Sequence, residues 1–131
     1  MSEPRPIPER LRSFALRRDR FTYDVRGGAF VEIGTVVAFR TDADTTLPEP
    51  AIAHALENEG LVSVHKDQQG QTHFTSCKLF MDLNTALRFA REQDQRSVFN
   101  LNRQQEMLAD ARPGSMPDAL GADQGLVGAA G

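Results

Sequence analysis

Glycine-containing turns recur through the middle of this chain and cut it into short apolar runs. A Gly-Gly pair at positions 27 and 28 separates RFTYDV at residues 20–25 from AFVEIGTVVAFR at residues 29–40. Two adjacent glycines can adopt the positive φ angles that a two-residue hairpin turn requires. We therefore predict a β-hairpin here, with Val25 opposite Phe30.

A second turn, Asp67-Gln-Gln-Gly70, lies between LVSVHK at residues 61–66 and QTHFTSCKLFM at residues 71–81. This pattern predicts a hairpin closed by a type I turn, with Gly70 in the left-handed conformation. If Gly70 forms a bulge, His65 lies directly opposite His73 on one face of the hairpin. A change of register by one residue would instead place the two histidines on opposite faces.

Segments with helical spacing surround these hairpins. Near the N-terminus, Leu11 and Phe14 fall on one face of a short amphipathic segment rich in arginine. A second helix follows the capping-box pattern that begins at Thr46, or begins only at Pro50, and ends before Gly60. A third begins after Asp82, a favourable N-cap, and a final strand, SVFNL, follows it.

The predicted order is therefore hairpin, helix, hairpin, helix, strand. Because a sheet with one apolar face must bury it against a second layer, we predict an α+β fold. It consists of a mainly antiparallel sheet of about five strands with helices packed on one face, and a short N-terminal helix.

The length of 131 residues, with 40% hydrophobic and 25% charged side chains, suits one domain with a real core. Residues 1–19 form a basic arm that contains the short helix, and residues 20–103 form the single α+β domain. Residues 104–131 are rich in glycine, alanine and proline without a sustained period, so we predict a disordered, flexible tail.

Several absences in the sequence bear on localisation. No apolar run approaches the roughly 18 residues that a membrane span needs, and the polar, proline-spaced N-terminus lacks the apolar region of a signal peptide. The single cysteine, Cys77, excludes an internal disulfide. The sequence therefore predicts a soluble, cytoplasmic protein with no membrane partner.

The distribution of charge leaves nucleic acid as an alternative partner. The formal net charge is −3, yet residues 1–20 carry six arginines against three acidic residues. Arginines can neutralise phosphates or contact an acidic protein surface. The candidate contacts in this arm are Arg10, Arg12, Arg17, Arg18 and Arg20.

The segment ALENEGLV, with the hairpin that follows it, resembles the recognition helix and wing of winged helix-turn-helix domains. That resemblance covers about twenty residues and implies DNA binding through the helix and a wing-like hairpin. Two features oppose it: a β ribbon precedes the helix where such domains have two supporting helices, and the helix carries Glu57 and Glu59 without an arginine or a lysine. DNA binding remains an alternative.

Histidines provide the candidates for a metal site. His65 and His73 face each other if the hairpin has the register described above, and His54 on the preceding helix is a third candidate ligand. A metal-dependent enzyme that uses these three residues is the second alternative. The competing interpretation is that they are solvent-exposed histidines of a sheet.

The sequence does not supply a nucleophile, base and acid that converge on one site, so we assign no catalytic residue and expect no cofactor. Hairpin strands leave sheet edges that can pair with a protein partner or with a second copy of the chain. We therefore predict a small non-catalytic protein-interaction module that binds a macromolecular partner. An accessory or inhibitor protein of a mobile element, phage or plasmid is consistent with the size and the acidic body.

Overall fold

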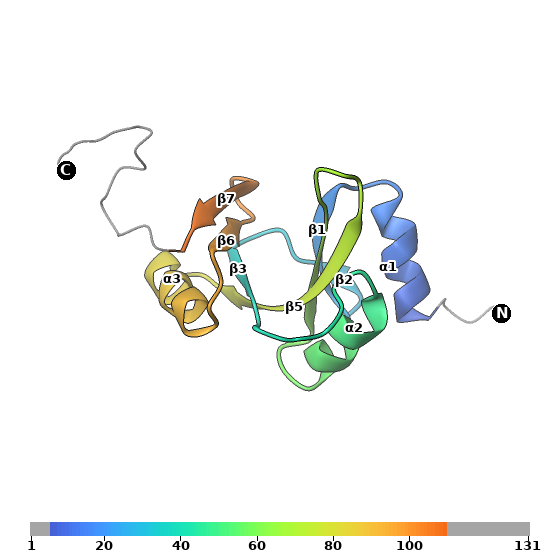
Figure 1. Ribbon diagram of the computed structural model, residues 1–131, viewed down its shortest axis with the longest axis horizontal. Helices are drawn as coiled ribbons and strands as arrows, with labels where there is room; N and C mark the ends of the chain where they lie inside the picture. Colours follow the sequence, from blue (N-terminus) through green and yellow to red (C-terminus); the bar gives the residue numbers. More distant parts are fainter. Residues whose placement is uncertain (1–5, 110–131) are drawn as a thin grey trace.

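The computed structural model describes residues 6–109, which form an α+β fold of three helices and one seven-stranded antiparallel sheet (Figure 1). In chain order the elements are α1 (Ile7–Ala15), β1 (Arg20–Asp24), β2 (Ala29–Phe30), β3 (Thr35–Ala38), α2 (Pro48–Leu56), β4 (Leu61–Lys66), β5 (Thr72–Phe80), α3 (Leu83–Glu92), β6 (Ser97–Asn100) and β7 (Gln105–Leu108).

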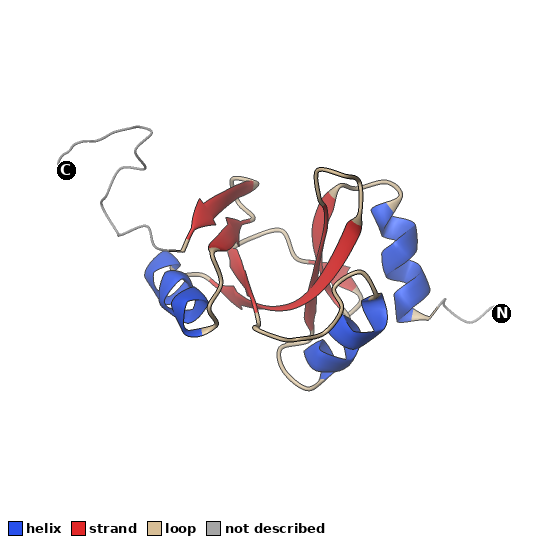
Figure 2. Cartoon of the chain, viewed as in Figure 1, coloured by secondary structure: helices blue, strands red, loops and turns tan. Residues whose placement is uncertain are grey.

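The strands are arranged in the order β2-β1-β4-β5-β3-β6-β7. The sheet curls into a trough, and β5, its longest strand, runs through the bend (Figure 2). All three helices pack on the outer, convex face, where α1 and α2 cover one end of the sheet and α3 covers the other. The prediction of a mainly antiparallel α+β fold with helices on one face is confirmed.

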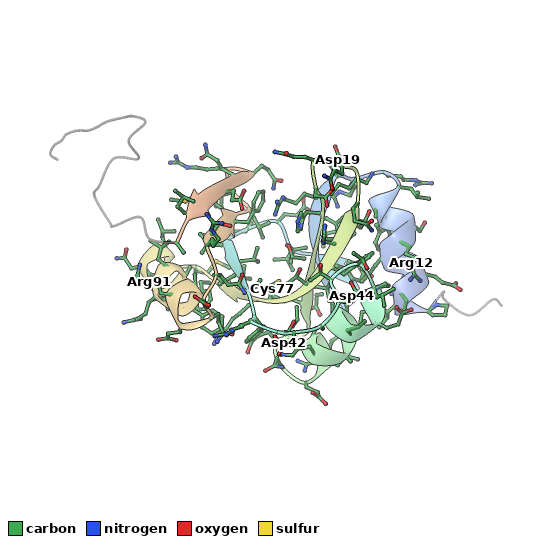
Figure 3. The ribbon with its side chains drawn as sticks, in the orientation of Figure 1. Arg12, Asp19, Asp42, Asp44, Cys77 and Arg91 are labelled. Atoms are coloured by element: carbon green, nitrogen blue, oxygen red, sulfur yellow. The ribbon has the colours of Figure 1, made fainter. Side chains whose placement is uncertain are left out.

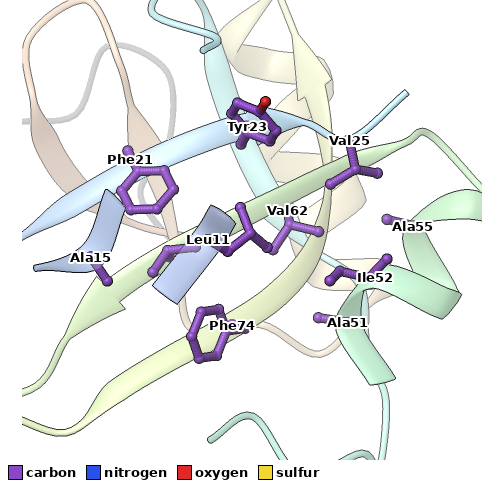
Figure 4. Close-up of a cluster of buried hydrophobic side chains, with 11 residues drawn as sticks. Leu11, Ala15, Phe21, Tyr23, Val25, Ala51, Ile52, Ala55, Val62 and Phe74 are labelled. Atoms are coloured by element: carbon purple, nitrogen blue, oxygen red, sulfur yellow. The ribbon is translucent and has the colours of Figure 1, made fainter. Parts of the chain in front are cut away.

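The larger core cluster lies between α1, α2 and the strands β1, β4 and β5 (Figure 4). It forms because alternate residues of each strand point to the convex face. Phe21 of β1, Val62 of β4 and Phe74 of β5 meet Leu11 of α1 and Ile52 of α2 there. Leu11 is completely buried, so the N-terminal segment docks on the sheet as its spacing predicts.

A second cluster fixes α3 on the other end of the sheet. Leu87 and its helix neighbours pack against Val37 of β3 and Val98 of β6. The helix begins where the Asp82 carboxylate accepts a hydrogen bond from the backbone N–H of Thr85 at 2.9 Å. The predicted N-cap is therefore confirmed.

The turn predictions around the second hairpin are also confirmed. Gly60 has a φ of 79° and donates its N–H to the carbonyl of Ala55 at 2.7 Å, which closes the end of α2. Gly70 has a φ of 83° and closes the β4–β5 turn. In the resulting register His65 pairs directly with His73.

The register predicted for the first hairpin is wrong. Tyr23, not Val25, pairs with Phe30, and Asp24 pairs with Ala29, so a four-residue turn at residues 25–28 joins the strands. The cause is the Asp24 carboxylate, which accepts hydrogen bonds from the N–H groups of residues 26 and 27, both at 2.9 Å. This side chain satisfies donors that a two-residue turn would have paired differently.

The predicted count of about five strands is also too low. The run at residues 29–40 is divided between two places in the sheet, because β2 pairs with β1 whereas β3 pairs with β5 and β6. The additional strand β7 falls within residues 104–131, for which no strand was predicted. The remainder of that predicted tail, residues 110–131, lies outside the described residues.

The capping box predicted at the start of α2 is not formed. The N-cap residue is Leu47, which makes no side-chain cap, and Pro48 occupies the first helical position. Thr46 instead donates its hydroxyl and its N–H to the Asp44 carboxylate, at 2.7 and 2.9 Å.

Among residues 6–109, no helix has the length and apolar character that crossing a bilayer requires.

Candidate functional site

Polar side chains line the concave face of the trough, in the positions that alternate with the convex core. Direct pairing places Arg20 of β1 beside His65 of β4, and His65 beside His73 of β5. These three residues therefore form one row across three strands. The imidazole rings of His65 and His73 stack, with centroids 5.2 Å apart and planes 18° from parallel.

A second row, parallel to the first, carries hydroxyl groups. Thr22, Ser63 and Thr75 are neighbours across the same three strands. Thr22 is buried and lies 3.5 Å from Ser63, measured between the side-chain oxygens. This half of the concave face therefore offers cationic and hydroxyl groups side by side.

The other half of the trough is more apolar and carries a negative charge at its rim. Val36 and Phe99 are paired on β3 and β6, and Glu106 of β7 lies opposite Phe99. The Glu106 carboxylate accepts a hydrogen bond from the Ser97 hydroxyl at 2.6 Å. The curl of the sheet brings the two halves together, because the guanidinium carbon of Arg20 lies 4.1 Å from the centroid of the Phe99 ring.

A cavity of about 370 Å³ occupies the concave face between these walls. That volume lies at the lower end of the range usual for sites that bind small ligands. Its lining combines two guanidinium groups, an imidazole, a carboxylate and several hydroxyls. The apolar floor includes Cys77, on the bent strand β5 (Figure 3). The lining residues used below are Arg20, Val36, Arg40, Ser63, His65, Thr75, Gln95, Phe99 and Glu106.

The concave setting shifts the pKa values of two of these groups. Burial lowers the pKa of His65, and the nearby charge of Arg20 lowers it further, so His65 is neutral at pH 7. Burial also lowers the pKa of Arg20, against the opposing effect of the Glu106 charge. The guanidinium remains protonated because its ordinary pKa is far above neutrality.

Hydrogen bonds join Asp67, His73 and Thr45 into a chain, of which Thr45 lines the cavity. Nε2 of His73 lies 2.8 Å from the Asp67 carboxylate, and Nδ1 lies 2.8 Å from the Thr45 hydroxyl. The hydrogen bond from His73 lowers the pKa of the Asp67 carboxyl. The chain ties the loop before α2 to the β4–β5 hairpin, and it has the order carboxylate, imidazole, hydroxyl.

Cys77 is poorly suited to nucleophilic chemistry, although it lines the cavity. Its side chain is 1% exposed, and burial raises the pKa of the thiol to about 12. The thiolate, which is the reactive form, is therefore scarce at neutral pH. We assign Cys77 to the floor of the cavity.

The three candidate metal ligands are not brought together. His65 and His73 share the concave face, but His54 of α2 packs on the convex side, where its Nδ1 lies 2.8 Å from the hydroxyl of Ser76. No group of three or more histidine, cysteine, aspartate or glutamate residues within residues 6–109 is placed to hold a metal ion.

The five candidate arginines do not form one surface. Arg12 lies 3.7 Å from the Glu49 carboxylate, Arg10 donates to the Tyr23 hydroxyl at 3.3 Å, and Arg18 lies over the Phe30 ring. These contacts are on or beside the convex layer. Arg17 is exposed after α1, and Arg20 alone projects into the concave cavity.

Sequence reasoning missed most of the cavity. The alternation of residues in β4 and β5 could have placed Ser63 with His65 and Thr75 with His73. Nothing local connects these strands with Phe99 or Glu106, because their proximity depends on the curl of the whole sheet.

No protein-family model, curated protein or solved structure matches this chain.

Proposed function

We propose that this protein is a non-catalytic protein-interaction module that binds a segment of a partner protein along its concave face. The observation that carries the proposal is the cavity lined by Arg20 and His65 on one side and Phe99 on the other. It combines apolar floor, uncharged hydrogen-bonding groups and a cation, which together suit a peptide with alternating side chains. An accessory or inhibitor protein would act through such a surface without chemistry of its own.

The outer edge of β7 supports the same proposal. This strand ends the sheet, and no strand of residues 6–109 pairs with its outer side. Leu108 is 64% exposed there, and the strand borders the cavity through Glu106. An extended partner segment can therefore add main-chain hydrogen bonds to β7 while its alternate side chains reach the trough.

The test is selection from a displayed library of random linear peptides, using the full chain as bait. We expect a consensus sequence to emerge and its binding to be lost in Phe99→Ser, which removes the apolar wall. Leu16→Ser, at an 83% exposed position after α1, is the matched control and should retain binding. Absence of any consensus, or equal binding to both variants, would contradict the proposal.

The hydrogen-bonded chain of Asp67, His73 and Thr45 favours hydrolysis as a second candidate function. A hydroxyl that contacts an imidazole, itself oriented by a carboxylate, has the order of groups found in nucleophilic hydrolases. A fluorophosphonate probe would label Thr45 if the hydroxyl is activated in this way, and His73→Ala would abolish labelling. If the wild-type protein is not labelled, these hydrogen bonds only hold the loop before α2 against the β4–β5 hairpin.

A further inference from the structure

Arg20 places a half-buried guanidinium in the concave cavity described above. The residue is the first of β1, and its side chain lies on the concave face beside His65. Its guanidinium contacts the Phe99 ring, 4.1 Å from the centroid. The ring contributes a favourable cation–π interaction but no oxygen that could accept a hydrogen bond.

The donors of this guanidinium have no acceptor within the described part of the chain. Among residues 6–109, Arg20 makes neither an ion pair nor a side-chain hydrogen bond. The charge of Glu106 raises the pKa of Arg20 against the effect of burial, and the Glu106 carboxylate accepts a hydrogen bond from the Ser97 hydroxyl. Burial of a cation without an acceptor costs free energy, which a bound anion would offset.

Uncharged groups of the cavity add hydrogen-bonding capacity to that of Arg20. Ser63 and Thr75 present hydroxyls on the adjacent strands, and Gln95 adds an amide. His65, whose pKa is lowered by burial, is neutral and can donate or accept. On the other side, Val36 and Phe99 provide contact for the methylene groups that carry a carboxylate.

The charges that surround the cavity favour a monoanion over a phosphate chain. Arg40 also lines the cavity, but it lies 3.9 Å from Asp94, and Glu106 places a negative charge at the rim. A dianionic phosphate needs more positive charge than Arg20 supplies alone. A carboxylate needs one guanidinium, whose planar donors match its two oxygens.

From this geometry we propose that the concave cavity is a carboxylate-recognition subsite in which Arg20 binds an acidic side chain or the terminal carboxylate of a partner peptide. The inference rests on the proposed function, because it names the chemical group that the partner presents. The cation–π contact with Phe99 holds the guanidinium in place before the ligand arrives, which reduces the ordering cost of binding.

The test uses three N-acetylated tetrapeptides of glycine, leucine, a variable residue and glycine, titrated into the full chain and followed by NMR. The first has glutamate at the variable position and a C-terminal amide, the second has glutamine and a free C-terminus, and the third has glutamine and an amide. We expect the third peptide to bind at least about tenfold more weakly than the better of the first two, the factor that a charge-assisted hydrogen bond provides. The first two peptides distinguish a side-chain carboxylate from a terminal one.

Three variants complete the design. Arg20→Gln should remove the preference for a carboxylate, and Arg17→Gln, on the exposed residue after α1, should preserve it. Glu106→Gln should strengthen binding of the carboxylate peptide without affecting the neutral one, and this result remains informative if Arg20→Gln fails to fold.

Equal affinity for the three peptides, or an unchanged preference in both the Arg20 and Glu106 variants, would overturn the carboxylate inference. If the peptides bind equally on the concave face, the proposed interaction function stands and only the chemistry of the ligand is wrong. If none of them binds, the carboxylate inference fails, and the library selection decides the proposed function independently.

Discussion

The contact between Arg20 and Phe99 joins the two halves of the curled sheet on its concave face, and a double-mutant cycle measures its strength. The variants are Arg20→Met, Phe99→Leu and the double variant. The guanidinium carbon lies 4.1 Å from the ring centroid, well inside the roughly 6 Å limit of a cation–π interaction. Phe99 is 9% exposed and Arg20 is half-buried.

The expected coupling energy follows from this intermediate burial. Cation–π pairs contribute about 0.5–1 kcal/mol at exposed sites and about 2 kcal/mol when they are desolvated. We therefore expect a coupling of about 1 kcal/mol between Arg20 and Phe99. The replacement side chains retain apolar volume, which limits the cavity terms that would otherwise enter the cycle.

Urea unfolding, followed by circular dichroism at a pH at which His65 is neutral, supplies the four free energies of unfolding. The control cycle pairs Arg18→Met with Phe99→Leu, because Arg18 lies over a different ring, that of Phe30. Control effects should add within about 0.5 kcal/mol. If the effects of Arg20→Met and Phe99→Leu also add within about 0.5 kcal/mol, the two residues do not interact across the trough and the reasoning is refuted.

Two further predictions concern stability. Replacing Leu87, which is 2% exposed on the buried face of α3, by alanine is expected to lower the free energy of unfolding by about 3 kcal/mol, because a cavity remains. In the same urea titration Leu16→Ala, at an 83% exposed position, should lie within about 0.5 kcal/mol of wild type. The second prediction concerns His65, whose pKa is lower in the folded protein than in the unfolded chain. As the pH falls below 6.5, the unfolded chain therefore binds the proton first. The free energy of unfolding is highest above that pH and declines as the pH falls through the folded pKa, by at most about 1.4 kcal/mol per pH unit. Burial lowers the pKa of His65 most, the charges of Arg20 and His73 lower it further, and those of Glu106 and Asp67 oppose the shift. In urea titrations from pH 7 to pH 5, the free energy of unfolding should decline less in His65→Gln than in the wild type. Identical pH profiles of the two proteins would contradict this assignment.

Local chemistry made part of the fold predictable. Gly60, Gly70 and Asp82 each perform a task that depends on neighbours within a few residues: a left-handed helix end, a left-handed turn position and an N-cap. Because the turn at Gly70 sets the register of its hairpin, the pairing of His65 with His73 followed from the same local signal.

Competition between local signals explains the errors in the first half of the chain. The adjacent glycines at 27 and 28 favour a tight turn, but the Asp24 carboxylate accepts two backbone N–H groups and lengthens the connection. Similarly, Thr46 has a nearer partner in Asp44 than in the helix that it was expected to cap. In both cases an aspartate side chain replaces the backbone pairing that residue pattern alone suggests.

Long-range geometry accounts for what could not be predicted. The strand β7 is short, and its two polar residues precede its two apolar ones, so it carries no alternating apolar signal. It forms because β6 presents an edge to it. The cavity depends on the curl that carries Arg20 to Phe99. The sequence could therefore indicate Arg20 and the two hairpin histidines as candidates, but not the wall that they face.

The most direct test of the concave binding site is a map of backbone amide chemical shifts on addition of a peptide obtained from the library selection. We predict that the perturbed amides concentrate on the concave strands, at residues 63–65, 73–75 and 97–99, and along β7. We also predict that the amides of the convex helices α1 and α3 remain unperturbed. Perturbations centred on those helices, with the concave residues unchanged, would contradict the account.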